Sequence, residues 1–127
     1  LGDVYKRQLP LLEAAAQGNL STLPLAEDPR YATTVMVVSG GYPGSYPKGK
    51  VITGTDNVKD ATLFHAGTKL GENGELLTSG GRVIACSAYG ENIDEALSNS
   101  YAAANAVEFD GKYFRRDIGA DLKKLMK

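Results

Sequence analysis

A β-branched run that leads directly into a stretch rich in glycine and proline constrains this chain more than any other feature of its sequence. The run "YATTVMVVSG" predicts a buried strand from about Ala32 to Ser39, because Val and Thr favour extended backbone. The following stretch, "SGGYPGSYPKG", holds four glycines and two prolines in residues 39–49. That composition breaks regular structure. It indicates either a plain solvent-exposed connector or a loop that brings its backbone close to a ligand.

The other segments predict an α+β domain. "GGRVIACSAYG" is typical of a central strand, and "ATLFHAGTKL" and "GELLTSG" indicate two strands around a turn at "GENG". "GKVITG" predicts a further short strand, and "VEFDGKYFRRDIG" an Asp-Gly turn between short extended pieces. Strands, a helix, short strands and a final helix fit a small mixed or antiparallel sheet with flanking helices. They fit a doubly wound parallel sheet less well.

The clearest helix follows the predicted central strand. Asn92 is suited to be its N-cap, and Glu95 lies three residues later, as in a capping box. A final amphipathic helix, "GADLKKLMK", ends the chain. In the helix predicted after Asn92, the apolar residues fall on one stripe, at Ile93, Ala96, Leu97, Tyr101 and Ala104.

The beginning of the chain is predicted to lie outside this domain. "LGDVYKRQ" shows no apolar periodicity, and its last six residues correspond to a translation of a transposon end used in DNA sequencing libraries. We therefore expect residues 1–8 to be a sequencing artefact, and the natural protein to extend upstream of Leu9. "LPLLEAAAQGNL" indicates the end of a helix, with Gly18 and Asn19 as its stop. Residues 21–30, with two prolines, form a predicted linker.

Composition excludes several classes of protein. Hydrophobic residues make up 43% of the chain and charged residues 23%, which is ordinary for a globular domain. A net charge of −1 gives no general attraction to nucleic acid or acidic membranes. No apolar run reaches the roughly 18–20 residues that a membrane span needs. The single cysteine, Cys86, excludes an internal disulfide and favours a reducing compartment, so we expect a cytoplasmic protein.

The glycine-rich loop is the first candidate for ligand binding. Gly40, Gly41 and Gly44 permit close backbone approach, and consecutive N–H groups can form an anion-binding concavity to which Lys48 adds charge. The stretch lacks the GxxxxGK[ST] pattern of a phosphate loop, and no helix follows it. A plain connector and a ligand loop both remain open.

Three arginines are the other candidates. Arg82 follows two glycines in "TSGGRV", which indicates either a tight hairpin or bulge, or a guanidinium presented beside exposed amides. Arg115 and Arg116 are adjacent on extended backbone and should point to opposite faces. One is expected to pair with a carboxylate such as Asp117 or Glu108, and the other is then available to solvent or a ligand. Arginine suits phosphate because its fork binds two oxygens, although a structural ion pair explains the pattern equally well.

The sequence shows no catalytic or metal site of its own. A lone histidine, His65, cannot build a metal site, and Cys86 lies in an apolar run where a core position is expected. Paired carboxylates with catalytic geometry and a Ser-His-Asp order are not evident. The glycine, lysine and arginine residues of the loops favour binding of an anionic small molecule, and any chemistry would be supplied from elsewhere.

Five segments occur in a characteristic order and spacing: "SGGYPGSYPKGKVITG", "FHAGT", "TSGGRV", "GENIDEALSNSYAAANAV" and "FDGKYFRRDIG". Together they resemble the C-terminal domain of the phosphoribosylamine–glycine ligase family, also called glycinamide ribonucleotide synthetase, of the ATP-grasp superfamily. The resemblance runs from about Leu9 to Gly119. It implies that residues 9–30 are the end of the ATP-grasp portion and a linker, and that residues 31–127 form the C-terminal domain.

The resemblance also implies a reaction. ATP phosphorylates the carboxylate of glycine, and the amine of 5-phosphoribosylamine attacks the acyl phosphate, giving glycinamide ribonucleotide, ADP and phosphate in purine (IMP) biosynthesis. ATP and Mg²⁺ or Mn²⁺ would be bound upstream of Leu9, so this chain alone is expected to bind neither and to be inactive. The missing ATP-grasp domain would be its partner.

Residues that face the substrate are expected among the charged and glycine-rich positions of the resembling segments. The candidate substrate-binding residues are Gly40, Gly41, Gly44, Lys48, Arg82, Arg115 and Arg116.

The alternative function is that of a stand-alone, non-enzymatic domain that binds an anionic metabolite or a partner protein.

Overall fold

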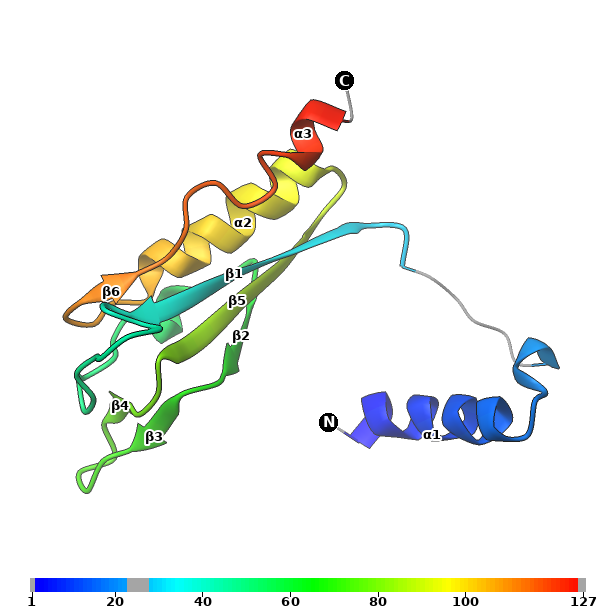
Figure 1. Cartoon of the computed structure of the whole chain (residues 1–127), viewed down its shortest axis with the longest axis horizontal. Coiled ribbons are helices and arrows are strands. Elements are labelled where there is room, and N and C mark those ends of the chain that lie inside the picture. Colours follow the sequence, from blue (N-terminus) through cyan, green and yellow to red (C-terminus); the bar gives the residue numbers. More distant parts are fainter. Residues whose placement is uncertain (1, 23–27, 126–127) are drawn as a thin grey trace.

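Two long antiparallel strands form the middle of the structure, a computed structural model that describes residues 2–22 and 28–125. β1 (Tyr31–Ser39) and β5 (Arg82–Gly90) pair along almost their whole length (Figure 1). Both strands are rich in apolar residues whose side chains fill the core, which is why they lie at the centre rather than at an edge. The strands predicted from the two apolar runs are confirmed.

Short strands complete two antiparallel sheets. β2 (Thr62–His65) pairs with β5, and β6 (Lys112–Tyr113) pairs with β1, so the larger sheet has the order β2-β5-β1-β6. β3 (Thr68–Leu70) and β4 (Leu76–Thr78) form a separate hairpin around the predicted turn. Every pairing is antiparallel, which confirms the expected α+β class.

One helix, α2 (Ile93–Ala106), covers one face of the larger sheet (Figure 1). Thr33 of β1 donates its hydroxyl to the carbonyl oxygen of Ala96 (2.7 Å) and lies 2.8 Å from the hydroxyl of Ser100. These bonds satisfy polar groups that would otherwise be buried without partners. The core between helix and sheet is fully buried and includes Val35, Val37, Ile84, Cys86, Ala104 and Val107.

The start of α2 is capped as the sequence predicts, with one difference. The side chain of Asn92 accepts a hydrogen bond from the Glu95 backbone N–H (2.9 Å), so Asn92 is the N-cap. The Glu95 carboxylate accepts from the N–H of Glu91 (2.8 Å) and not from that of Asn92. The reciprocal bond of the capping box is therefore displaced by one residue toward the preceding strand.

The other end of α2 is held by a lysine from β6. The ammonium of Lys112 donates to the carbonyl oxygens of Ala104 (3.3 Å), Asn105 (3.2 Å) and Val107 (2.7 Å), and to the Glu108 carboxylate (2.7 Å). A cation here satisfies carbonyl groups that the helix leaves unpaired and complements the negative end of its dipole. Lys112 thus fastens a very short edge strand to the helix.

The prediction of one continuous strand over residues 61–70 is wrong. The segment bends, and its two halves form β2 and β3, which belong to different sheets. The backbone N–H groups of Ala66 and Gly67 both donate to the carbonyl oxygen of Val83 (3.0 Å each). The chain turns around that one carbonyl. A contact between segments so distant in sequence leaves no local signal.

The short strand predicted in "GKVITG" is also wrong. Residues 49–54 make only two isolated bridges, from Val51 to Leu77 and from Thr53 to Glu108. Because the two partners belong to different parts of the chain, a continuous ladder does not form. The 3₁₀ helix η2 (Thr55–Asn57) follows immediately.

The terminal helices differ from their predicted lengths. α1 (Gly2–Ala16) begins before Leu9, is followed by the 3₁₀ helix η1 (Leu20–Thr22), and lies apart from the sheet in Figure 1. α3 (Leu122–Leu125) is a single turn, shorter than predicted. Residues 23–27 of the predicted linker, and the last two residues of the predicted final helix, lie outside the described residues.

Glycine-containing turns meet at the end of the sheet where β1 stops and β5 begins. We call this meeting point the glycine junction. Its turns contain Gly40, Gly67, Gly80, Gly81 and Gly111. Its backbone hydrogen bonds run from Ser39 N–H to Gly81 O (2.8 Å), from Gly40 N–H to Gly111 O (2.7 Å) and from Ser79 N–H to Gly67 O (2.7 Å).

Replacing Gly67 with alanine should lower the free energy of unfolding by about 2–3 kcal/mol, measured by urea denaturation. A Cβ atom at Gly67 would lie 2.4 Å from the carbonyl oxygen of Arg82 and 2.8 Å from the Cα of Gly80. Both atoms belong to the backbone and cannot move aside as a side chain would.

Gly49→Ala is the matched control. Gly49 has a φ of +75° but open space around it, so alanine there should cost about 1 kcal/mol from backbone strain alone. Equal losses in the two variants would show that the close approach at Gly67 does not stabilise the fold.

Candidate functional site

The face of the sheet opposite α2 carries apolar side chains that remain accessible. Register places Met36 of β1 opposite Ala85 of β5, and Phe64 of β2 on the other side of Ala85. Residues that face each other across a ladder share a face, so these three side chains form a row. Phe64 is 55% exposed and Tyr113 on β6 is 58% exposed. We call this surface the open face; its residues are Ala32, Thr34, Met36, Val38, Thr62, Phe64, Arg82, Ala85, Ser87, Tyr89 and Tyr113.

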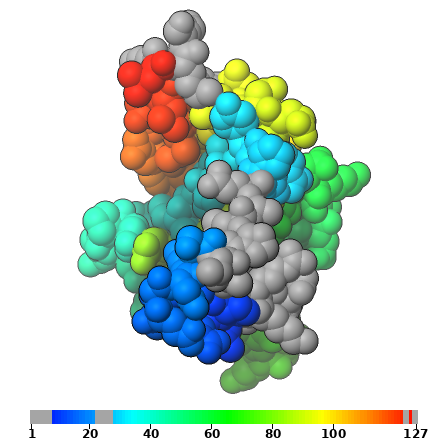
Figure 2. All heavy atoms as spheres, turned by 90° about the vertical axis from the view of Figure 1, so that its right-hand side faces the viewer, coloured from blue at the N-terminus to red at the C-terminus, as the bar shows by residue number. Residues whose placement is uncertain are grey.

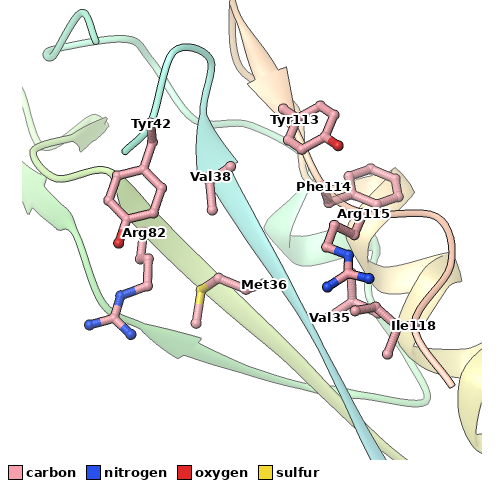
Figure 3. A pocket seen from close by; sticks show the side chains of 9 residues that line it. All are labelled: Val35, Met36, Val38, Tyr42, Arg82, Tyr113, Phe114, Arg115 and Ile118. Atoms are coloured by element: carbon pink, nitrogen blue, oxygen red, sulfur yellow. The ribbon is translucent and has the colours of Figure 1, made fainter. Parts of the chain in front are cut away.

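A hollow of about 290 Å³ lies on the open face. Figure 3 shows Tyr42 and Arg82 on one side of β1, with Tyr113, Phe114 and Arg115 on the other. Aromatic and aliphatic groups therefore line the hollow, with a guanidinium on each side. The lining residues are Val35, Met36, Val38, Tyr42, Arg82, Tyr113, Phe114, Arg115 and Ile118.

A β-bulge carries Arg82 to this surface. Val37 pairs with Ile84 while the next residue, Val38, pairs with Arg82, so Val83 is an extra residue on β5. The pairing sets Arg82 on the same face as Val38. One interpretation of "TSGGRV", the bulge, is confirmed, and the same bulge presents the guanidinium.

Tyr42 reaches the hollow because Gly81 has no side chain. A Cβ atom at Gly81 would lie 2.0 Å from a ring carbon of Tyr42. The ring of Tyr42 in turn packs edge-on against Tyr46, with centroids 6.0 Å apart. The packing of Tyr42 against the backbone of Gly81 thus holds the glycine-rich loop beside the start of β5.

Arg115 is bound to a carboxylate, whereas Arg116 has no carboxylate partner among the described residues. The Nε and Nη2 atoms of Arg115 donate to the two oxygens of Asp117 (2.9 and 2.8 Å), and these bonds hold the pKa of the Asp117 carboxyl below its ordinary value. Arg116 lies 5.0 Å from the centre of the Phe114 ring. Within residues 2–22 and 28–125, no carboxylate pairs with Arg116 or Arg82. The expected pairing of one of the adjacent arginines with Asp117 is confirmed, and a ligand role for Arg116 stays a prediction.

The glycines of the loop make their close approaches within the chain. A Cβ atom at Gly40 would lie 2.7 Å from the carbonyl oxygen of Gly111, and one at Gly41 would lie 2.3 Å from that of Ser45. Gly44 and Lys48 do not line the hollow. The loop projects from one side of the molecule (turquoise in Figure 2), below the C-terminal segment in that view. A ligand role for these residues stays a prediction.

The two potentially reactive side chains are engaged elsewhere. Cys86 is buried in the core, and desolvation raises the pKa of its thiol to about 11, which opposes thiolate formation. The Nδ1 atom of His65 lies 3.0 Å from the hydroxyl of Thr68. In the described part of the chain, no three His, Cys, Asp or Glu side chains gather closely enough to hold a metal ion. The described residues therefore do not fit a divalent metal.

Comparison with known proteins identifies the family. A family model for the C domain of phosphoribosylglycinamide synthetase matches residues 32–121. The chain belongs to this family. It is 46% identical to the phosphoribosylamine–glycine ligase of Nostoc over 112 residues, which cover 86% of this chain and 26% of that ligase.

Other relatives agree. The chain is 38% identical to a bifunctional purine biosynthetic protein of Dictyostelium discoideum, covering 87% of this chain and 15% of that protein. The crystal structure of phosphoribosylamine–glycine ligase from Thermotoga maritima matches with a TM-score of 0.67 and 33% identity, over 84% of this chain and 27% of that one. The chain thus spans about a quarter of the ligases that it matches, at their C-terminal portion.

No helix in the described part of this family member is long and apolar enough to cross a membrane. Sequence reasoning did not single out Met36, Val38, Tyr113 or Ile118 as site residues. The alternation of β1 could have indicated two of them, because Met36 and Val38 alternate with the buried Val35, Val37 and Ser39.

Arg115→Met should raise the pKa of the Asp117 carboxyl toward its ordinary value, measured by carboxyl-carbon NMR. The depressed pKa means that the ion pair forms fully above the ordinary carboxyl range and breaks as pH falls through the lowered value. Arg116→Met is the matched control and should leave the Asp117 titration unchanged. The same upward shift in both variants would contradict the assignment of the pair.

Proposed function

We propose that this chain is the C-terminal part of a phosphoribosylamine–glycine ligase, which joins glycine to 5-phosphoribosylamine as ATP is hydrolysed to ADP and phosphate in purine (IMP) biosynthesis. One observation carries this proposal: most of the chain aligns with such ligases, but with only their C-terminal quarter. Residues 9–30 then belong to the end of the ATP-grasp portion and a linker, and residues 31–127 to the C-terminal domain.

The chemistry of the ligase lies mainly outside this domain. In this proposal, ATP and Mg²⁺ or Mn²⁺ would be held by the rest of the polypeptide and would activate the glycine carboxylate there. The domain's own contribution is to bind and orient the phosphorylated substrate at a shared cleft. Alone, it is inactive. We also propose a cytoplasmic location, which the single cysteine, Cys86, favours.

Arg82 is the strongest candidate for contact with the substrate phosphate. Of the seven residues proposed from the sequence, only Arg82 and Arg115 line the hollow. Arg115 already binds Asp117, so a phosphate would have to displace that carboxylate, whereas Arg82 has no such competitor in residues 28–125. A guanidinium can bind two phosphate oxygens at once, which suits an anionic substrate.

A chimera tests the proposed reaction. Replacing the C-terminal quarter of the Nostoc ligase with this chain should give an enzyme that forms glycinamide ribonucleotide and ADP from glycine, ATP and 5-phosphoribosylamine. The truncated Nostoc ligase and this chain alone, as controls, should each be inactive. A chimera no more active than the truncated ligase would contradict the proposal and favour a stand-alone binding domain.

Arg82→Ala in the chimera should raise KM for 5-phosphoribosylamine by roughly 10- to 150-fold, with KM for ATP nearly unchanged, because a charged hydrogen bond contributes roughly 1.5–3 kcal/mol. Lys69→Ala on β3 removes a cation that does not line the hollow and should change neither value. An unchanged KM for 5-phosphoribosylamine in the Arg82 variant would exclude this residue from the phosphate site.

A further inference from the structure

The turn at the tip of the β3–β4 hairpin contains the one asparagine of this chain that precedes a glycine. Asn73 and Gly74 lie in the "GENG" turn between the two strands, and both are exposed. Figure 1 shows this turn at the end of the hairpin that lies away from α2. The asparagines that precede a residue with a side chain are Asn19, Asn57, Asn92, Asn99 and Asn105.

The backbone of Gly74 can attack the side chain of Asn73. Three carbon atoms separate the Gly74 nitrogen from the Asn73 carboxamide carbon, so a bond between the two closes a five-membered ring. A side chain on the following residue hinders this closure, and Gly74 has none. A Cβ atom placed at Gly74 would meet nothing within 4 Å, so the space around the ring is open.

The hydrogen bonds of the turn leave the reacting groups available. The Asn73 backbone N–H donates to the Glu75 carboxylate (3.0 Å), and the Gly74 N–H donates to the carbonyl oxygen of Gly71 (3.1 Å). Within residues 2–22 and 28–125, the Asn73 carboxamide has no hydrogen-bond partner. The attack therefore requires the loss of a single backbone hydrogen bond, in a surface turn, where local opening costs little free energy.

We propose that Asn73 is a site of spontaneous deamidation. Base removes the proton of the Gly74 nitrogen, which then bonds to the carboxamide carbon of Asn73. The bond from that carbon to the amide nitrogen breaks, and ammonia leaves after taking a proton from water. Water opens the resulting cyclic imide at either carbonyl, which gives aspartate or isoaspartate at position 73. The reaction requires no partner and does not depend on the proposed function.

The Asp110–Gly111 pair provides a contrast within the same chain. Gly111 has nearly the same φ as Gly74, +78° against +81°. The Asp110 carboxylate, however, accepts a hydrogen bond from the Lys50 ammonium (2.6 Å), which holds the pKa of the carboxyl below its ordinary value. An ionised carboxylate resists attack because it has no neutral leaving group, whereas the Asn73 carboxamide carries no charge. The same ring closure is therefore expected at Asn73 and not at Asp110.

Deamidation changes the hairpin in two ways. Aspartate adds a negative charge between Glu72 and Glu75, and like charges so close repel. Isoaspartate moves a methylene group from the side chain into the backbone and so lengthens the turn. Because the length of a turn fixes the register of its strands, the pairing of Leu70 with Leu76 should weaken.

Timed incubation of the 127-residue chain in mildly alkaline buffer tests the site. Trypsin would release residues 70–82, in which Asn73 is the only asparagine. By mass spectrometry, this peptide should show the mass gain of a carboxamide-to-carboxylate change at least tenfold faster than any peptide with another asparagine. An isoaspartyl methyltransferase should label the product, because direct hydrolysis of the carboxamide would give aspartate alone.

Asn73→Gln is the matched control. Glutamine keeps a carboxamide in the turn but would have to close a six-membered ring, so residues 70–82 of this variant should gain no mass over the same period. Equal rates at all asparagines, a mass gain that persists in the variant, or a product without isoaspartate would each overturn the proposal.

Hydrogen exchange measures the effect on the hairpin. The Gly71 N–H donates to the carbonyl oxygen of Glu75 (2.8 Å) and closes the turn. Its exchange should be faster in the aged wild-type chain than in the fresh one, and equal in fresh and aged Asn73→Gln. Unchanged exchange in fully deamidated protein would overturn the predicted weakening of the hairpin.

Discussion

The structure depends on direct contact between backbones at the glycine junction. Four separate turns end within hydrogen-bonding distance of one another there, and Gly67 approaches the carbonyl oxygen of Arg82 more closely than any side chain permits. This contact bends the segment between β2 and β3 and sends its two halves to different sheets. It also sets where β5 begins, and with it the bulge at Val83.

The site is a consequence of that junction. The bulge places Arg82 on the open face, and the bare backbone of Gly81 lets Tyr42 pack against the start of β5. On the other side, Lys112 fastens β6 to α2, so that Tyr113, Phe114 and Arg115 follow at a defined place. Gly81 therefore shapes the hollow through its contact with Tyr42, and arginine, aromatic and aliphatic side chains form the surface of the hollow.

Under the proposed function, this domain contributes a surface to a larger enzyme. Among the described residues, every buried side-chain nitrogen or oxygen atom has a hydrogen-bond partner, and the single thiol is buried. Its uncommitted features are an apolar face and a guanidinium without a carboxylate partner among the described residues. Both are explained if the remaining three quarters of a ligase, with the nucleotide and metal sites, pack against it. The family membership and the geometry of the open face both support the proposal that this domain supplies a surface and that the rest of the ligase supplies the nucleotide and metal sites.

The sequence by itself determined the elements whose signals are local. The β-branched runs predicted β1 and β5, Asn92 and Glu95 predicted the start of α2, and "GENG" predicted the β3–β4 turn, because each depends on neighbouring residues. The motifs also predicted the family. Only the tertiary structure decided the bend at Gly67, the isolated bridges of residues 49–54 and the meeting of Arg82 with Arg115 at one hollow. Those features arise from backbone contacts and strand register between segments far apart in the chain, and no local pattern encodes them.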